Sequence, residues 1–177
     1  MKRISAIFIL LVVLSVPSSA EKKKVAIAIG YGITMPSDSK TQDTFGNTWS
    51  GLSLETFEPS VPSSWRPKGV ARAFRLNGPV SARLYPLTYG IERGFGEKAS
   101  VRPFVQFQIG PYYGKIKDTT TGLNTSHVGL NTNVAVGVII KRRFYVEARY
   151  DHFTPIAGYD FDGLSLSAGI RAVDIRL

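Results

Sequence analysis

The strongest constraint on the fold of this chain is a strict alternation of apolar residues with polar or small residues. Between Val101 and Tyr113, an apolar series alternates with a second series that holds Arg, Gln, Gly and aromatic residues. Successive side chains of a β-strand point to opposite faces of the sheet, so a period of two predicts a long strand with one apolar face. After residue 20 we find no apolar stripe with the period of a helix, and the chain is therefore predicted to be all-β. The same alternation recurs over residues 24–33, 128–141, 144–153 and 164–172.

The clear segments and the weaker ones together give eight predicted strands. Asn77-Gly78 is a strong signal for a tight hairpin turn between two of them. Residues 34–47 read as a long polar loop, and residues 58–68 read as a link between strands. An alternative is that residues 34–68 form one large surface loop and that the strand boundaries shift. The predicted strands are 24–33, 49–57, 69–76, 80–91, 100–116, 127–141, 144–153 and 163–173.

Alternation alone does not say which face of the sheet is buried. A soluble β-domain places the apolar face in its core, whereas an outer-membrane barrel turns that face toward lipid. Several segments are longer than the usual soluble strand of about 5–6 residues, and the polar faces mix small residues with Glu147, Arg149 and Arg171. We therefore predict an antiparallel up-and-down transmembrane β-barrel of eight strands. A soluble lipocalin-like carrier is the alternative.

The lengths of the connections predict which end of the barrel faces outward. Arg142-Arg143 forms a very tight link, while other connections are longer and polar. Outer-membrane barrels have short periplasmic turns and longer extracellular loops. We expect residues 34–47, 117–126 and 154–162 to face outward, and an even number of strands to place both termini in the periplasm.

The first twenty residues have the pattern of a secretory signal peptide. Met1-Lys2-Arg3 is basic, Ile4 to Val16 is an apolar run, and small residues end at Ala20. The run is shorter than the roughly 20 residues of a membrane-spanning helix. We expect a signal peptide over residues 1–20 and a barrel domain over residues 21–177 in the outer membrane.

Composition narrows the classes of function and partner. The chain has no cysteine, which excludes disulfide scaffolds, thiol catalysis and cysteine-bound metals. Its net charge of +9 would suggest nucleic acid in a cytoplasmic protein, but an exported protein meets lipopolysaccharide and anionic lipid instead. We therefore expect outer-membrane lipid and lipopolysaccharide as partners, no nucleic acid, and a monomer.

Four segments resemble the small outer-membrane β-barrel families of the OmpA, OmpX and OmpW types. The resemblance covers about half of the chain after residue 20 and implies eight strands, insertion by the barrel-assembly machinery and no cofactor. The chain departs from these families at its end, because Leu177 stands where they usually have a terminal aromatic residue. The segments are Arg102-Pro103-Phe104-Val105 leading to Gly110, Asn131 to Gly137, Glu147 to Tyr150, and Leu164 to Arg171.

One short motif is a candidate for catalysis. His152-Phe153-Thr154 is similar to the His-x-Ser pair of the barrel-shaped lipid A deacylases, which hydrolyse an acyl ester. That resemblance implies Thr154 as nucleophile, His152 as its base, and Asp160 or Asp162 as the orienting acid. The alternative is a set of polar residues at the membrane–water boundary. His127 is the only other histidine, and its isolation predicts no metal site.

The remaining predictions concern structure rather than chemistry. Glu147, Arg149 and Arg171 are expected to pair inside the barrel, where unpaired charge is costly. The function predicted from these features is a structural or surface-interaction role without catalysis. The alternatives are the deacylase, an OmpW-like conduit for small hydrophobic solutes, and the lipocalin-like carrier. The residues expected to form an aromatic girdle at the membrane surface are Tyr31, Tyr113, Phe144, Tyr150 and Phe153.

Overall fold

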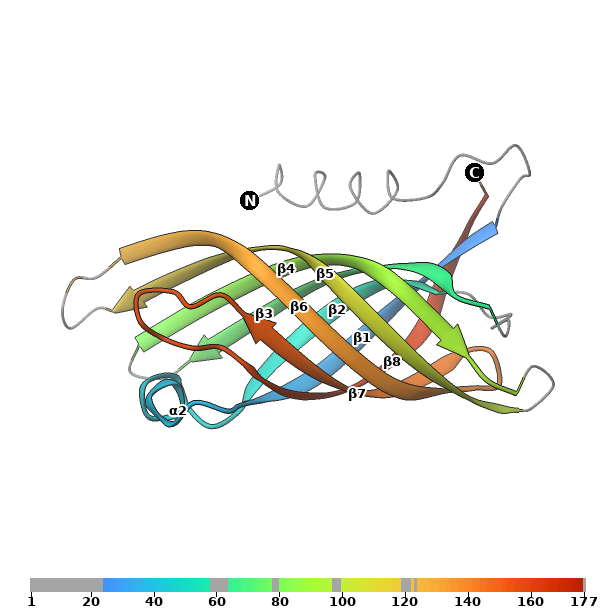
Figure 1. Ribbon diagram of the computed structural model, residues 1–177, viewed down its shortest axis with the longest axis horizontal. Coiled ribbons are helices and arrows are strands. Elements are labelled where there is room, and N and C mark those ends of the chain that lie inside the picture. The colour runs from blue at the N-terminus through green and yellow to red at the C-terminus, as the bar shows by residue number, and fades with distance from the viewer. Residues whose placement is uncertain are drawn as a thin grey trace.

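Eight antiparallel strands close into a single barrel in the computed structural model (Figure 1). Each strand pairs with the next in sequence, and β1 also pairs with β8, so that the ring is complete. The structure describes residues 24–57, 64–77, 80–96, 100–118, 122 and 124–176, and the predicted signal peptide lies outside these ranges. The strands are β1 (Lys24–Pro36), β2 (Trp49–Phe57), β3 (Arg66–Asn77), β4 (Val80–Gly94), β5 (Val101–Asp118), β6 (Asn124–Ile140), β7 (Phe144–Phe153) and β8 (Gly163–Arg176).

The eight predicted strands are confirmed, with boundaries that differ by a few residues. The alternative of one surface loop over residues 34–68 is wrong, because β2 lies within it and pairs with β1 and β3. The sequence predicts a long polar loop over residues 34–47, but this segment contains the helix α2 (Ser39–Phe45). Asp38 caps this helix by accepting a hydrogen bond from the backbone N–H of Thr41 at 2.8 Å. Among the described residues, no helix has the length and apolarity needed to cross a membrane.

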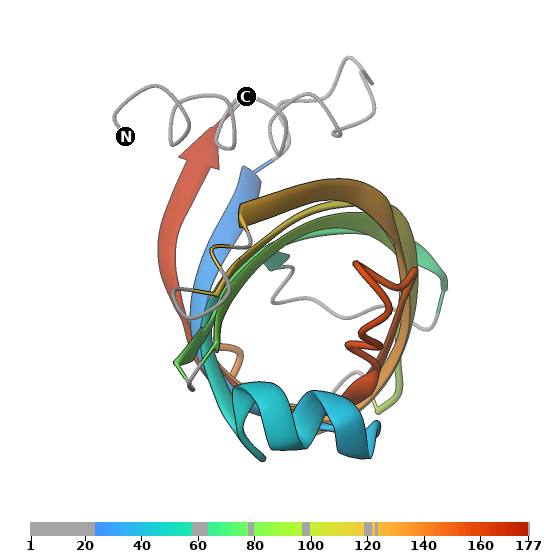
Figure 2. The same cartoon turned by 90° about the vertical axis from the view of Figure 1, so that its left-hand side faces the viewer.

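The two ends of the barrel differ in what covers them. Helix α2 and residues 154–162 lie at one end, which we call the α2 end, and Figure 2 shows both of them around its mouth. The start of β1, the end of β8 and the three-residue turn 141–143 lie at the other end, which we call the terminal end (Figure 1). Lys141 and Arg142 have positive φ angles, as do the two central residues of a type I′ turn.

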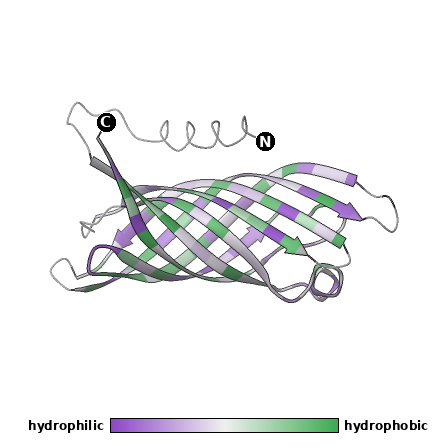
Figure 3. Ribbon diagram, turned by 180° about the vertical axis from the view of Figure 1, so that it is seen from behind, coloured by the Kyte–Doolittle hydropathy of each residue, from purple (hydrophilic) through white to green (hydrophobic). Residues whose placement is uncertain are grey.

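The apolar face of the sheet points outward, as the sequence predicts. Leu52 is 60% exposed and Val136 is 56% exposed, while the polar residues that alternate with them are buried inside the barrel. Figure 3 shows the resulting alternation of hydrophobic and hydrophilic residues along the strands. This arrangement is the reverse of a lipocalin-like barrel, in which the apolar face would line the interior.

The interior consists of an apolar layer at each end and a polar layer between them. Tyr145 belongs to the layer at the terminal end, and Gly30 and Gly169 leave room for its ring, because a Cβ at either position would overlap it. The layer at the terminal end consists of Ala26, Ala28, Phe57, Phe104, Ile139 and Tyr145. The layer at the α2 end consists of Phe45, Trp49, Phe74, Leu76, Ala82, Leu84, Tyr112, Ile116, Phe153, Ile156 and Phe161.

Candidate functional site

The polar layer contains a chain of ion pairs that begins between neighbouring strands. The Nζ atom of Lys68 on β3 lies 3.2 Å from an oxygen of Glu55 on β2 and 3.5 Å from an oxygen of Glu92 on β4. All three side chains are buried. A buried charge is tolerated where opposite charges and hydrogen bonds replace its water, and Lys68 has two carboxylates within reach.

Arg149 on β7 continues the chain of ion pairs across the interior. Its guanidinium donates to Glu147 at 2.7 and 3.0 Å, and it lies 3.8 Å from Glu55. The remaining nitrogen donates to Gln108 at 2.6 Å and to Asn133 at 3.1 Å. Arg149 is 1% exposed, so these four side chains take the place of its hydration.

A second ion pair crosses the width of the barrel. Arg72 on β3 donates to Asp151 on β7, with one of the two hydrogen bonds at 2.6 Å, and to Asn131 on β6 at 3.1 Å. Strands β3 and β7 are not neighbours in the sheet. The pair therefore joins opposite walls, and it fills the lumen with side chains rather than water.

The structure brings together two of the three charges that the sequence grouped. Glu147 and Arg149 are paired inside the barrel, but Arg171 pairs with Asp174 on the exposed terminal end of β8. Two features of the sheet explain the difference. The register of β8 shifts against β1 between Arg171 and Val173, and β7 ends its pairing with β8 at Ile170. Arg171 therefore lies beyond the closed part of the wall.

Other members of the ion network were missed in the sequence. Glu55, Arg72 and Asp151 occupy positions that alternate with the outward-facing apolar residues of predicted strands. That alternation is the sequence signal that could have identified them as inward-facing. Lys68 and Glu92 lie one residue outside the predicted strands 69–76 and 80–91, so their face could not be assigned.

The apolar layer at the α2 end closes the mouth of the barrel. Phe161, from the 154–162 segment, packs against Phe45 of α2 and Trp49 of β2, with ring centroids 5.4 and 5.7 Å apart. Helix α2 is tied to the same segment, because the Thr41 hydroxyl donates to the Asp160 carbonyl at 2.6 Å. Figure 2 shows the helix and this segment side by side on the rim of the barrel.

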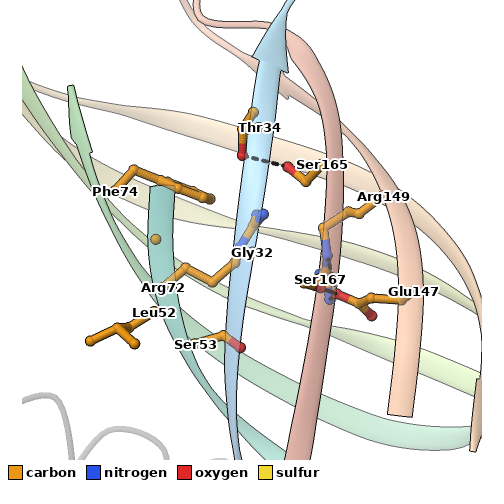
Figure 4. Close-up of a pocket in the computed structure, with 11 residues that line it drawn as sticks. Gly32, Thr34, Leu52, Ser53, Arg72, Phe74, Glu147, Arg149, Ser165 and Ser167 are labelled. Carbon is orange, nitrogen blue, oxygen red and sulfur yellow. Dashed lines mark hydrogen bonds and ion pairs between the residues drawn. The ribbon is translucent and has the colours of Figure 1, made fainter. Parts of the chain in front are cut away.

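A small cavity lies in the polar layer below this cover, between Thr34, Ser53, Arg72 and Arg149 (Figure 4). Its volume is about 20 Å³. Thr34 and Ser165 at its edge share a hydrogen bond of 2.8 Å. A volume of this size holds roughly one water molecule, so the cavity is far too small for a hydrated ion.

The candidate catalytic residues lie at the α2 end. The Nδ1 atom of His152 lies 2.5 Å from an oxygen of Asp162, whose other oxygen accepts from the backbone N–H of Phe153 at 2.7 Å. The His152 side chain is 61% exposed on the outside of the barrel. The Thr154 hydroxyl accepts from the backbone N–H of Leu130 at 3.0 Å. Asp160 accepts a hydrogen bond from the backbone N–H of Asp162 at 2.9 Å, whereas the carboxylate that meets His152 is that of Asp162.

Four of the five residues expected in the aromatic girdle face outward, and one does not. Phe153 is 1% exposed and packs edge-on against Tyr112 inside the mouth, with centroids 5.1 Å apart. It follows the outward-facing His152 in the alternation, so the parity of β7 turns it inward. The outward-facing aromatic residues are Tyr31, Tyr113, Phe144 and Tyr150.

The ring of His127 lies beside that of Tyr112, with centroids 6.3 Å apart. The described residues contain no group of three potential metal ligands.

Comparison with solved structures places this fold among bacterial outer-membrane barrels. Ail of Yersinia pestis has a TM-score of 0.58 at 16% identity, covering 86% of this chain and 100% of Ail. Neisserial surface protein A has a TM-score of 0.56 at 12% identity, covering 84% of this chain and 95% of that protein. The N-terminal β-barrel domain of Pseudomonas aeruginosa OprF has a TM-score of 0.52 at 12% identity, covering 85% of this chain and 100% of that domain. No protein-family model and no curated protein matches the sequence. The chain therefore has the fold of the eight-stranded outer-membrane β-barrels.

Proposed function

We propose that this protein is a non-conducting barrel of the outer membrane that acts at the cell surface through its α2 end. An even number of strands places both termini at one end of the barrel. Barrels of this fold have short turns on the periplasmic side and longer loops outside the cell. The 141–143 turn thus lies in the periplasm, and α2 and residues 154–162 lie outside.

The observation that carries this proposal is the closed interior. The apolar layer at the α2 end lies above the ion network, and a second apolar layer lies below it. An open pore needs a continuous path of water, and a hydrophobic conduit needs an open apolar path to the side or through the lumen. The cavity beside Arg72 and Arg149 in the polar layer holds about one water molecule. The closed lumen therefore favours a surface role over the OmpW-like conduit.

The outer surface of the α2 end joins the helix and the 154–162 segment. Lys40 of α2 donates to the Gly158 carbonyl at 2.9 Å and lies 4.6 Å from the ring centroid of Tyr159. These contacts hold the helix against residues 154–162, so both segments contribute to one surface. Two proteins of the same fold are named for surface roles, Neisserial surface protein A and the attachment invasion locus protein Ail.

Site-specific labelling tests the orientation, because the natural chain has no cysteine. Asp43 on α2 and Arg142 in the 141–143 turn are both exposed. In intact cells, a membrane-impermeant maleimide is expected to label Asp43→Cys but not Arg142→Cys, and permeabilised cells are expected to show both. Labelling of Arg142→Cys alone in intact cells would reverse the orientation and refute the proposal.

Recording from planar bilayers tests the closed interior. The purified barrel is expected to give no stable openings across the physiological range of voltage. As a positive control, Phe161→Gly with Trp49→Gly removes two large rings from the cover, and it is expected to increase any residual current. Regular openings in the natural protein would contradict the proposal.

A second candidate function is hydrolysis of an acyl ester of lipid A, which the His152–Asp162 pair favours. A carboxylate on Nδ1 leaves Nε2 of the imidazole free to act as a base, as in hydrolytic triads. His152 would take the proton of the Thr154 hydroxyl as Oγ1 attacks the ester carbonyl, and it would give that proton to the leaving alkoxide. Water would then hydrolyse the acyl-threonine ester and release the fatty acid. The hydroxyl accepts from Leu130 but retains its own hydrogen for donation.

Mass spectrometry of lipid A distinguishes the two candidates. Cells that express the natural protein are compared with cells that express His152→Ala or Asp162→Asn at equal levels of folded barrel. Under the surface-interaction proposal, all three produce the same lipid A. Loss of one acyl chain in the natural protein alone would establish the hydrolase instead.

A further inference from the structure

The last strand continues past the end of one neighbour at the terminal end of the barrel. Strand β7 begins at Phe144, and its pairing with β8 extends only as far as Ile170. One more hydrogen bond follows, from the backbone N–H of Arg171 to the Arg143 carbonyl at 2.8 Å. β8 then continues to its end, paired with β1 on its other side. Among the described residues, the edge of β8 that faces away from β1 therefore has no partner strand over residues 172–176.

A β-bulge bends this part of β8. Arg171 lies opposite Ala28 of β1 and Val173 lies opposite Ile27, so Ala172 has no partner on β1. An extra residue of this kind bends the strand that contains it. Figure 2 shows the end of β8 and the start of β1 side by side, beyond the ring that the other strands form. A space thus opens between β8 and the turn that precedes β7.

This space is a cleft with basic residues on both sides. Its volume is about 450 Å³. Of its described lining residues only Asp174 is acidic, and it forms an ion pair with Arg171. Neither Lys141 nor Arg142 forms an ion pair within the described part of the chain, so the cleft has an excess of positive charge. We call it the β8 cleft, and its lining residues are Lys141, Arg142, Arg143, Arg171, Ala172, Val173 and Asp174.

The unpaired edge and the charge together identify the kind of partner. An unpaired edge presents N–H and C=O groups that an extended chain can satisfy by adding a strand. A small anion or a lipid headgroup can neutralise the cations but cannot pair with successive backbone groups. A second copy of this chain is disfavoured, because it would bring two sets of three cations, Lys141, Arg142 and Arg143, close together. An extended segment with acidic side chains satisfies both the edge and the charge.

We propose that the β8 cleft binds an extended acidic segment of a second protein, which pairs with residues 172–176 of β8 as an additional strand. The acidic side chains of this segment lie beside the 141–143 turn. The cleft forms only once β8 has paired with both β1 and β7, so the site belongs to the finished barrel and not to its assembly. In the orientation given under the proposed function the terminal end faces the periplasm, so the partner is a periplasmic protein. Only this location rests on the proposed function, because strand addition depends on the cleft alone.

Synthetic peptides test the proposal on the natural protein. The probe is a short fluorescent peptide in which Glu alternates with Val, and it is titrated into the refolded barrel in neutral detergent. One control peptide has Lys in place of Glu, and the other is the acidic peptide with every backbone nitrogen methylated. We expect each control to bind at least about 10-fold more weakly, because one reverses the charge and the other removes the backbone donors. Equal affinity of the probe and either control, or no binding of the probe at millimolar concentration, would overturn the proposal.

Amide hydrogen exchange locates the bound peptide. Saturation with the acidic peptide is expected to increase the protection of amides within residues 172–176, because the bound strand accepts from the unpaired edge. The amides of α2 at the opposite end are expected to be unchanged. Binding without added protection in β8 would place the peptide elsewhere and overturn strand addition.

A triple variant removes the charge from one side of the cleft. It combines Lys141→Asn, Arg142→Asn and Arg143→Gln, and Asn suits the positive φ angles of the first two positions. The variant is first shown to be folded by its heat-dependent shift in gel migration. We expect it to lose about 10-fold in affinity for the acidic peptide, because three exposed ion pairs are lost. Unchanged affinity would overturn the role of the turn.

Two further variants show that the effect is local. Arg83→Gln with Lys115→Gln and Lys117→Gln removes three exposed cations near the α2 end, and this control should bind the peptide like the natural protein. Asp174→Asn removes the acidic residue of the cleft and releases Arg171 from its ion pair, so it should bind the acidic peptide more tightly. Equal losses in the control and in the turn variant, or an unchanged or lower affinity in Asp174→Asn, would overturn the placement of the peptide.

Competition distinguishes a peptide from an anionic lipid. Phosphatidylglycerol in mixed micelles, at the concentration of the peptide, is expected to displace little of it. Complete displacement would overturn the assignment of the partner and identify a lipid headgroup as the ligand. Failure of the orientation would be seen separately, in the cysteine labelling of Asp43→Cys and Arg142→Cys.

Discussion

At the scale of single residues, Arg149 shows how a barrel of this size can hold charge in its interior. Each nitrogen of its guanidinium donates to a side-chain oxygen of Glu147, Gln108 or Asn133. Hydrogen bonds to charged groups contribute more than neutral ones, but a buried charge that loses its partner is strongly destabilising. The interior is therefore sensitive to single substitutions and tolerant of paired ones.

The pair that joins opposite walls provides a prediction of this kind. Arg72→Met or Asp151→Leu alone should each destabilise the barrel by about 3–5 kcal/mol, because each leaves an unpaired charge in the interior. The double variant should lose less than the sum of the two. Urea unfolding of the three variants in detergent, analysed as a double-mutant cycle, measures the coupling. Strict additivity would show that the two side chains do not interact.

The lipid-facing surface gives a second prediction at this scale. Val136→Arg should cost about 2–4 kcal/mol or prevent assembly, because lipid near the bilayer midplane cannot solvate a guanidinium. Asn133→Asp lies on the same strand with its side chain inside, where it faces Arg149, and it should cost less. Both are measured by unfolding in lipid vesicles. Equal losses would mean that the two faces of β6 have been assigned incorrectly.

At the scale of elements, the strands were predictable and the helix was not. A strand with one face in lipid has to alternate along its whole length, so the sequence carries the signal at every second residue. Helix α2 has only seven residues, which is too short to show a helical period. It is stabilised by its local cap, Asp38, and by packing against residues 154–162, and the second contact depends on a part of the chain that is distant in sequence.

The same distinction holds for the candidate site. The inward position of Glu147 and Arg149 follows from parity within one strand, and the sequence predicts it. The ion pair between Arg72 and Asp151 depends on which walls face each other across the closed barrel, and Phe161 depends on how a loop folds back. Neither can be read from alternation, because both are set by closure of the ring.

The cap of α2 gives a prediction with a defined pH dependence. Hydrogen bonds from the Thr41 side chain and backbone lower the pKa of Asp38 from its ordinary value. Because this pKa is lower in the folded state than in the unfolded state, the stabilisation is complete at neutral pH and is lost as the pH falls through the lowered pKa. The protection of the amides of residues 37–48 against hydrogen exchange, relative to an unfolded chain at the same pH, should therefore fall in acid, below about pH 4.

Two variants provide the controls for this measurement. Asp38→Ala should show low protection of these amides at every pH, because the acceptor is absent. Asp38→Asn retains a hydrogen-bond acceptor that does not titrate. In this variant, hydrogen exchange of the α2 amides should no longer show the change in acid that comes from protonation of the cap. If the natural protein and Asp38→Asn respond identically to acid, Asp38 is not the group responsible.

At the scale of the whole molecule, the barrel depends on the junction between its first and last strands. Thr34 on β1 lies directly opposite Ser165 on β8, and their hydroxyls are 2.8 Å apart. The chain has no cysteine, so Thr34→Cys with Ser165→Cys should form one disulfide across the junction. Under oxidising conditions, boiling in detergent should no longer give the mobility of the fully open chain, and reduction should restore it. Unchanged mobility in the oxidised form would show that the two strands are not adjacent.

The layered interior also limits how such a protein can enter a membrane. Arg72 on β3 reaches Asp151 on β7 only when the sheet curves round on itself, and Arg149 on β7 comes near Glu55 on β2 in the same way. A flat, partly inserted sheet would expose these groups to hydrocarbon, where a single charge costs several kcal/mol. Insertion of the sheet and closure of the barrel are therefore expected to be one cooperative event, and a half-inserted sheet is not expected to be a stable intermediate in the bilayer.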